Sequence, residues 1–249
     1  MAKNDGIIKI KGTLDNMTFY KSMDGDMIRK KGGVSKKRIM KDPAFARTRE
    51  NISEFTSSAQ SGKLLRLAVN DLLQQAKDSR VTSRLTKVMM EIQKLDTVDV
   101  RGQRKVSIGI EEDEGKALLL GFNFNKRANL SSVLRAFYST DAVTGEVSIP
   151  DFQPATGVVA PEGATHVGLR SAFVNVDFET GAYEGSTSPV ENLELDMSIL
   201  DVNLIPASVP AGTGTDLVLL LIEFFQEVNG EQYPLRNGAH NSLCIVDIG

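Results

Sequence analysis

The stretch Leu217-Val-Leu-Leu-Leu-Ile-Glu-Phe-Phe225 is the longest apolar run in the chain, and Glu223 is its only charged residue. A short apolar run bounded by turn residues is typical of a strand that is buried on both faces. A strand of an ordinary two-layer sandwich buries only one face. We therefore expect a helical unit of the same chain, or a neighbouring subunit, to cover the second face.

The residue pattern around this run is typical of a β-sheet protein. After Asp99 the segments become short and alternating, and Gly and Pro separate them. Asn229-Gly230 is the strongest hairpin signal, because a type I′ turn needs positive φ at both positions. Further turn signals are Glu114-Gly115, Thr144-Gly145 and Glu179-Thr-Gly181. The pattern predicts an antiparallel β-sandwich, jelly-roll or immunoglobulin-like, over residues 99–249. Its strands are expected near residues 104–111, 116–124, 132–140, 145–149, 165–178, 192–203, 216–228 and 242–248.

A small helical unit is expected over residues 42–98. Asp42 followed by Pro43 predicts a helix start, since Asp caps helices and Pro is favoured at the first helical position. We expect this helix to turn Phe45, Ile52 and Phe55 towards the core and to end near Gly62. Apolar residues then recur at the three-and-four spacing of a helix over residues 63–78 and again over 81–95.

Residues 1–41 are predicted to form a basic β arm. Ile8 and Ile10 alternate with lysines, and Met17 and Phe19 alternate with polar neighbours. A few short strands bury little on their own, so the arm needs a partner surface in this chain or in another. With the helical unit and the sandwich, the predicted fold class is α+β and mainly β.

Charge is segregated along the chain. The net charge of the whole chain is −3. Residues 1–105 hold 23 Lys/Arg and 12 Asp/Glu, a net charge of +11, whereas residues 106–249 hold 6 Lys/Arg and 20 Asp/Glu, a net charge of −14. The basic half could bind a polyanion such as nucleic acid. It could instead face the acidic half of the next copy in a head-to-tail contact, or it could be solvated surface without a partner. The candidate subunit-interface residues are Ile8, Ile10, Met17, Phe19, Arg29, Lys30, Lys31, Lys36, Lys37 and Arg38.

The sequence offers few residues for catalysis. One cysteine, Cys244, excludes an intramolecular disulfide and a thiolate zinc site, and only His166 and His240 could serve as imidazole ligands or bases. Gly212-Thr-Gly214 lacks the Lys-Ser/Thr of a phosphate loop, and the acidic run at 111–114 does not match a calcium loop. We expect a protein that is not an enzyme and that takes no cofactor and no small-molecule substrate.

The sequence also bears on the cellular location. The N-terminus lacks the apolar run of a secretory signal. No apolar run reaches the roughly 18 residues of a membrane-spanning helix. We therefore expect a cytoplasmic protein that has no membrane partner, or one that is exported without a cleaved signal.

Several segments carry a resemblance to a known family. They are residues 11–21 (KGTLDNMTFYK), 31–35 (KGGVS), 42–51 (DPAFARTREN), 161–166 (PEGATH) and 223–230 (EFFQEVNG). The chain resembles a family of uncharacterised proteins widespread in Bacteroidota. The resemblance implies a basic N-terminal arm with a C-terminal β-sandwich, and a link to cytoplasmic fibril- or tubule-forming proteins of gliding bacteria. It implies no catalytic residue.

These observations predict a non-enzymatic structural protein that self-assembles into a homopolymer, with copies of itself as partners. The arm would add strands to a sheet edge of a neighbour, and basic surfaces would face acidic ones. The alternative is a sequence-independent nucleic-acid-binding or phage-related structural protein. A third hypothesis is a sandwich that binds a small ligand or glycan through loops 150–165 and 205–216.

Overall fold

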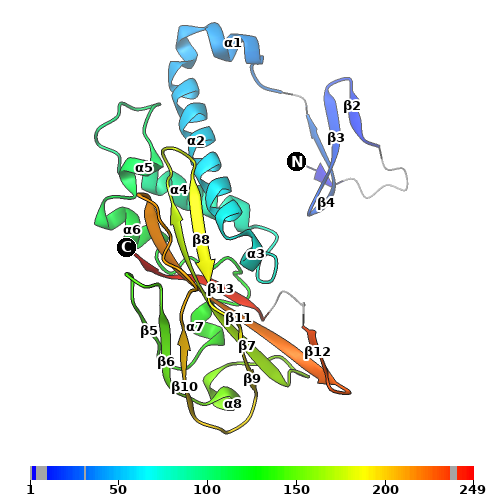
Figure 1. Ribbon diagram of the computed structural model, residues 1–249. Coiled ribbons are helices and arrows are strands. Elements are labelled where there is room, and N and C mark those ends of the chain that lie inside the picture. Colours follow the sequence, from blue (N-terminus) through cyan, green and yellow to red (C-terminus); the bar gives the residue numbers. More distant parts are fainter. Residues whose placement is uncertain (1, 4–9, 31, 236–239) are drawn as a thin grey trace. The chain divides into compact units, whose positions relative to one another are not determined.

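The computed structural model describes residues 2–3, 10–30, 32–235 and 240–249 (Figure 1). The chain forms two compact units, residues 1–49 and 50–249. Helices and antiparallel sheets are both present, and the fold is α+β and mainly β, as predicted. None of the described helices is long and apolar enough to cross a membrane.

The second unit contains two antiparallel sheets. The larger is built on two long central strands, which pair over residues 166–176 and 215–225. Each central strand shares its outer edge between two shorter strands. The sheet contains β7 (His166–Val176), β8 (Tyr183–Thr187), β9 (Glu191–Glu194), β11 (Thr215–Val228), β12 (Glu231–Pro234) and β13 (Ser242–Ile248). The smaller sheet contains β5 (Ser139–Thr140), β6 (Val147–Phe152) and β10 (Leu200–Leu204).

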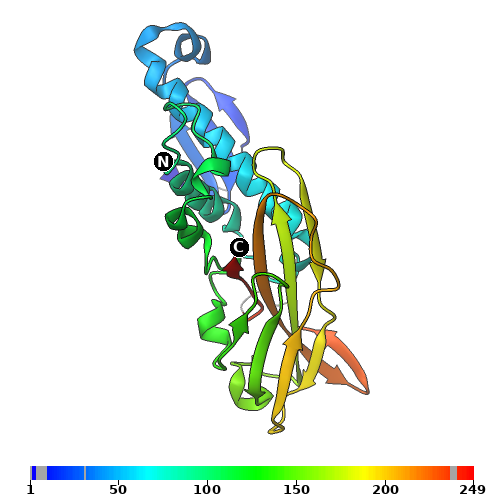
Figure 2. The same cartoon turned by 60° about the vertical axis from the view of Figure 1, so that its left-hand side comes forward.

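The helices of this unit form a layer on one side of the larger sheet and short turns elsewhere (Figures 1 and 2). They are α2 (Ala46–Ala68, which begins in the first unit), α3 (Asn70–Leu73), α4 (Val81–Gln93), α5 (Val106–Gly109), α6 (Asp113–Leu119), α7 (Leu130–Val133) and α8 (Pro154–Gly157).

Strand β11 is buried on both faces, as its sequence predicts. Leu219 and its i±2 neighbours belong to a core cluster with the helical residues Leu65, Leu85 and Met89. Leu220 and its i±2 neighbours belong to a second cluster that includes side chains of the smaller sheet. The helical cover is provided by this same chain, so the unit has three layers, in the order helices, large sheet, small sheet.

The strands expected at 104–111 and 116–124 are wrong, because these residues form α5 and α6. Gly115 is not a turn residue but lies inside α6, and a Cβ there would stand 2.9 Å from the carbonyl carbon of Gly109. A Cβ on Gly109 would in turn stand 2.9 Å from the carbonyl carbon of Ile92 in α4. These glycines let the backbones of three short helices approach closely, a use of glycine that resembles a turn signal in the sequence.

Some of the other predicted strands and turns agree with the structure, and some do not. Asn229 and Gly230 have φ of 56° and 83° and connect β11 to β12, which confirms the hairpin. The segment expected as one strand at 132–140 contains α7 and only the two-residue β5. The segment expected at 192–203 is divided between β9 and β10. Strands β8 and β12 were not predicted, because all their residues except one are exposed and show no apolar alternation.

Helix α2 differs from its prediction in length and in orientation. It continues through Gly62, and Ile52 and Phe55 are 49% and 53% exposed instead of facing the core. The buried side of its first half is polar. Glu54 accepts hydrogen bonds from the Arg104 guanidinium at 2.7 and 2.8 Å, and Ser58 donates to Gln93 at 2.7 Å. The loop over residues 96–105 thus docks on α2 through polar side chains.

The first unit is a small sheet followed by a short helix. Its elements are β1 (Ala2–Lys3), β2 (Gly12–Leu14), β3 (Met17–Ser22), β4 (Gly25–Lys30), α1 (Lys36–Lys41) and the 3₁₀ turn η1 (Pro43–Phe45). The strand order is β1-β4-β3-β2, so the described strands include the expected meander. Helix α1 was not predicted. The Asp42 carboxylate accepts the Ala44 N–H at 3.0 Å, which confirms the expected cap.

Candidate interaction surfaces

The N-terminal sheet has no core of its own. None of the described residues in the first unit is buried. Ile10, Leu14 and Met17 are 44%, 58% and 47% exposed, whereas Phe19 is half-buried. A small sheet needs a covered hydrophobic face to be stable. Its apolar side chains therefore offer a surface that further packing would stabilise.

The predicted interface residues that the structure describes lie on strands β3 and β4, on helix α1 and just before β2. Met17 and Phe19 are on β3, where they pair with Lys30 and Ile28 of β4, and Arg29 is also on β4. The lysines at 36 and 37 and Arg38 form the first turn of α1, and Ile10 precedes β2. Ile8 and Lys31 lie outside the described residues.

Local partners distinguish the basic side chains of the first unit from one another. Arg38 forms an ion pair with Asp42 at 3.1 Å and lies 5.7 Å from the ring centre of Phe45. Arg29 lies 5.4 Å from the ring centre of Tyr20. Lys36 and Lys37 are exposed, and among the described residues neither forms an ion pair. The two lysines are therefore open to a polyanion.

The two units carry opposite charge. Residues 1–49 hold 13 Lys/Arg and 5 Asp/Glu, a net charge of +8. Residues 50–249 hold 16 Lys/Arg and 27 Asp/Glu, a net charge of −11. Much of the negative charge comes from residues 171–235, which contain 11 Asp/Glu and no Lys or Arg. This stretch includes the edge strands β8, β9 and β12. These three edge strands therefore carry acidic side chains and no basic ones.

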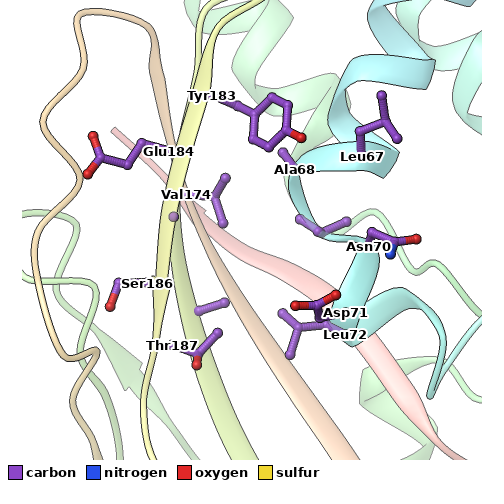
Figure 3. A pocket seen from close by; sticks show the side chains of 13 residues that line it. Leu67, Ala68, Asn70, Asp71, Leu72, Val174, Tyr183, Glu184, Ser186 and Thr187 are labelled. Carbon is purple, nitrogen blue, oxygen red and sulfur yellow. The ribbon is translucent and has the colours of Figure 1, made fainter.

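A cleft runs between helix α2 and the hairpin that joins β7 to β8. One hollow of this cleft has a volume of about 440 Å³. In it, Tyr183 of β8 points towards Leu67 and Ala68 of α2 (Figure 3). A second hollow of about 460 Å³ shares Leu67 and continues to Phe178. Leu67 and Tyr183 are 47% and 49% exposed. The cleft thus has an apolar floor that is open to solvent.

One wall of the cleft is the free edge of β8. The Ala182 carbonyl accepts the Asp177 N–H, and the Ser188 N–H donates to the Ser171 carbonyl of β7. The residues between Ala182 and Ser188 therefore alternate in direction. The backbone groups of Tyr183, Gly185 and Thr187 therefore point away from β7. The Thr187 carbonyl accepts the Ala207 N–H at 3.2 Å. In the described part of the chain, no hydrogen bond reaches the outward groups of Tyr183 or Gly185.

The residues that sequence reasoning considered for catalysis lie apart from this cleft. Cys244 is 3% exposed, and burial raises its pKa to about 12, so the thiolate is absent at neutral pH. His166 lies 2.9 Å from the Thr165 hydroxyl and 3.7 Å from the Glu227 carboxylate. Over the described ranges, no group of three or more His, Cys, Asp or Glu side chains is arranged to hold a metal ion.

The strongest electrostatic sites stabilise the fold. The Arg104 guanidinium holds the pKa of Glu54 below its usual value, and the Gly102 N–H donates to the same carboxylate at 2.8 Å. Burial opposes ionisation of Asp96. Nevertheless, backbone N–H groups of Asp99, Lys105 and Val98 keep the pKa of Asp96 lowered. Both carboxylates hold the 96–105 loop in place.

The sequence predicts only one of the two candidate interaction surfaces. The arm residues were named, whereas the β8 edge was missed, and the long stretch without Lys or Arg was the available signal for it. No protein-family model matches the chain, and the comparisons with curated proteins and with solved structures found no match. The resemblance to the Bacteroidota family therefore stays a prediction.

Proposed function

We propose that this chain is a non-enzymatic structural protein that assembles into a homopolymer through its N-terminal sheet. The observation that carries the proposal is the absence of a buried side chain among the described residues of that sheet, although it presents Leu14 and Met17. Burial of apolar surface contributes about 25 cal/mol per Å². A neighbouring copy that covers these side chains would stabilise the sheet and join the two molecules.

Charge supports a contact between unlike surfaces. The first unit carries +8 and the second carries −11, so a first unit is attracted to the second unit of another copy. Exposed ion pairs contribute only about 0–1 kcal/mol each. In this proposal, charge therefore selects the partner surface and speeds encounter, while apolar burial and strand pairing supply most of the affinity.

The proposal is tested by removing the apolar side chains from the sheet. We expect a variant with Leu14→Ser and Met17→Ser to lose the assemblies that the unchanged protein forms, as measured by light scattering and electron microscopy. A matched control changes the exposed Val98 and Val100 of the second unit to Ser, since these are 76% and 67% exposed. Unchanged protein that stays monomeric at high concentration and low salt would contradict the proposal.

The second candidate function is sequence-independent nucleic-acid binding. The exposed Lys36 and Lys37 of α1 favour it, together with Arg29 and Lys30 at the end of β4. Such binding would rest on phosphate contacts and would weaken steeply with salt. A mobility-shift assay at low and moderate salt tests it, with Lys36→Glu and Lys37→Glu as the variant. No shift at low salt would exclude this function.

A further inference from the structure

We infer that the cleft beside β8 is the acceptor site for the N-terminal sheet of a second copy, in a head-to-tail contact. The inference rests on the proposed self-assembly and adds the surface that receives the sheet. The acceptor comprises the outward backbone groups of Tyr183 and Gly185 on β8 and the apolar cleft lined by Leu64, Leu67 and Phe178. The donor is the edge strand β2 (Gly12–Leu14), whose residues are all exposed.

The two edges have compatible backbones. Tyr183 and Gly185 present outward N–H and C=O groups with no partner in the described part of the chain. Strand β2 lies at the edge of its own sheet, and its middle residue, Thr13, points its backbone groups away from β3. An exposed sheet edge accepts an additional strand through main-chain hydrogen bonds. Each edge is only a few residues long, so the lengths also agree.

Side chains complement this pairing. Leu14 is 58% exposed on β2, and Tyr183 and Leu67 are about half exposed in the cleft. Since an apolar side chain leaves water more readily for an apolar floor, the cleft offers Leu14 a place to bury. Asp71 at the rim of the cleft and Glu184 on the far face of β8 provide negative charge (Figure 3). This charge would attract Lys11, which directly precedes β2.

Charge also decides which edges can meet. Two copies that pair β8 with β8 would bring like acidic strands together, because residues 171–235 contain no Lys or Arg. Like charges directly opposite each other on paired strands are destabilising. The donor strand β2 carries no acidic residue and follows Lys11, so its pairing with β8 avoids this cost. The acidic edges thus disfavour a symmetric dimer and permit the heterologous contact that leads to rings or filaments.

Cysteine cross-linking between two different variants tests the inference. One variant carries Leu14→Cys and the other Tyr183→Cys, and the mixture is treated with a short bis-maleimide. Native Cys244 does not react with the maleimide, because it is buried and its pKa is raised to about 12. The matched control replaces Tyr183→Cys by Tyr233→Cys, which is 52% exposed on the acidic edge strand β12. We expect a cross-linked dimer with the first pair and its loss with the control pair.

The other outcomes distinguish this inference from the proposed function. Assemblies seen by scattering without a Leu14→Cys to Tyr183→Cys cross-link would leave self-assembly intact and overturn the acceptor site. Equal cross-linking to Tyr233→Cys would also overturn it. A double variant that cross-links only within one chain would mean that the sheet occupies its own cleft. Monomers without any cross-link would contradict both statements.

Discussion

Replacing two helical glycines by alanine should change stability in opposite directions. Gly62 and Gly115 both lie inside helices, where exchange of Gly for Ala gains about 0.5–1 kcal/mol. At Gly62 the new Cβ would lie 3.5 Å from Leu85 Cγ and 3.7 Å from Met89 Cγ, which are ordinary contacts. At Gly115 it would lie 2.9 Å from the Gly109 carbonyl carbon and 3.1 Å from Ile110 Cα. The obstacle there is backbone, which no side-chain rotation can move aside.

The structure gives a magnitude for this difference. Overpacking costs about 1–3 kcal/mol, and contact with backbone places Gly115→Ala near the upper end. Gly62→Ala keeps the helix gain, so the two variants should differ by roughly 3 kcal/mol. In a unit of this size each kcal/mol shifts Tm by about 2–4 °C, which predicts a difference of roughly 6–12 °C.

Thermal unfolding followed by circular dichroism measures this difference, and urea unfolding provides an independent value. We expect Gly62→Ala to melt above the unchanged protein and Gly115→Ala to melt below it. A Gly115→Ala variant as stable as Gly62→Ala would refute the close packing of α5 and α6.

Three further predictions concern the core, the buried charges and the cysteine. Leu220→Ala should lower the free energy of unfolding by about 2–5 kcal/mol in urea unfolding, since Leu220 is fully buried between the sheets. Glu54→Gln should cost about 1–3 kcal/mol, because Arg104 loses a charged partner. The lowered pKa values of Glu54 and Asp96 predict stability that is present above their usual values of 4.5 and 3.8 and is lost as the pH falls through the lowered values. Urea midpoints measured down that range should fall less steeply for Glu54→Gln than for the unchanged protein. Cys244 should react with a maleimide only after unfolding, and rapid labelling of the native protein would contradict its burial.

The sequence predicts the parts of this fold in which burial follows a regular pattern. The apolar run of β11 and the Asn229-Gly230 turn were assigned correctly, because each depends on neighbouring residues alone. The burial of Glu54 could not be predicted, since its partner Arg104 lies 50 positions away in the chain. That distant pair leaves Ile52 and Phe55 on the outside of α2.

The candidate surfaces, too, comprise one part that the sequence predicts and one part that depends on residues distant in the chain. The composition of residues 1–41 identified the arm as basic and poor in core residues, whereas β8 was not recognised as a strand, because a polar edge strand resembles a loop in sequence. Its position beside α2 depends on the pairing of β7 with β11, which joins residues about 50 positions apart. Only the three-dimensional arrangement brings an edge and an apolar floor together.

The two-sided burial of β11 has a consequence for synthesis on the ribosome. Helix α4 and strand β6 are synthesised long before residues 217–222 of β11. These residues pack against the helical layer on one face and against the smaller sheet on the other. Until that strand emerges, the nascent chain holds two apolar layers that lack their common partner. Exposed apolar surface of this kind promotes aggregation and engages chaperones. We expect the second unit to acquire protease resistance late, after translation has passed Ile222, and not stepwise from its N-terminal side.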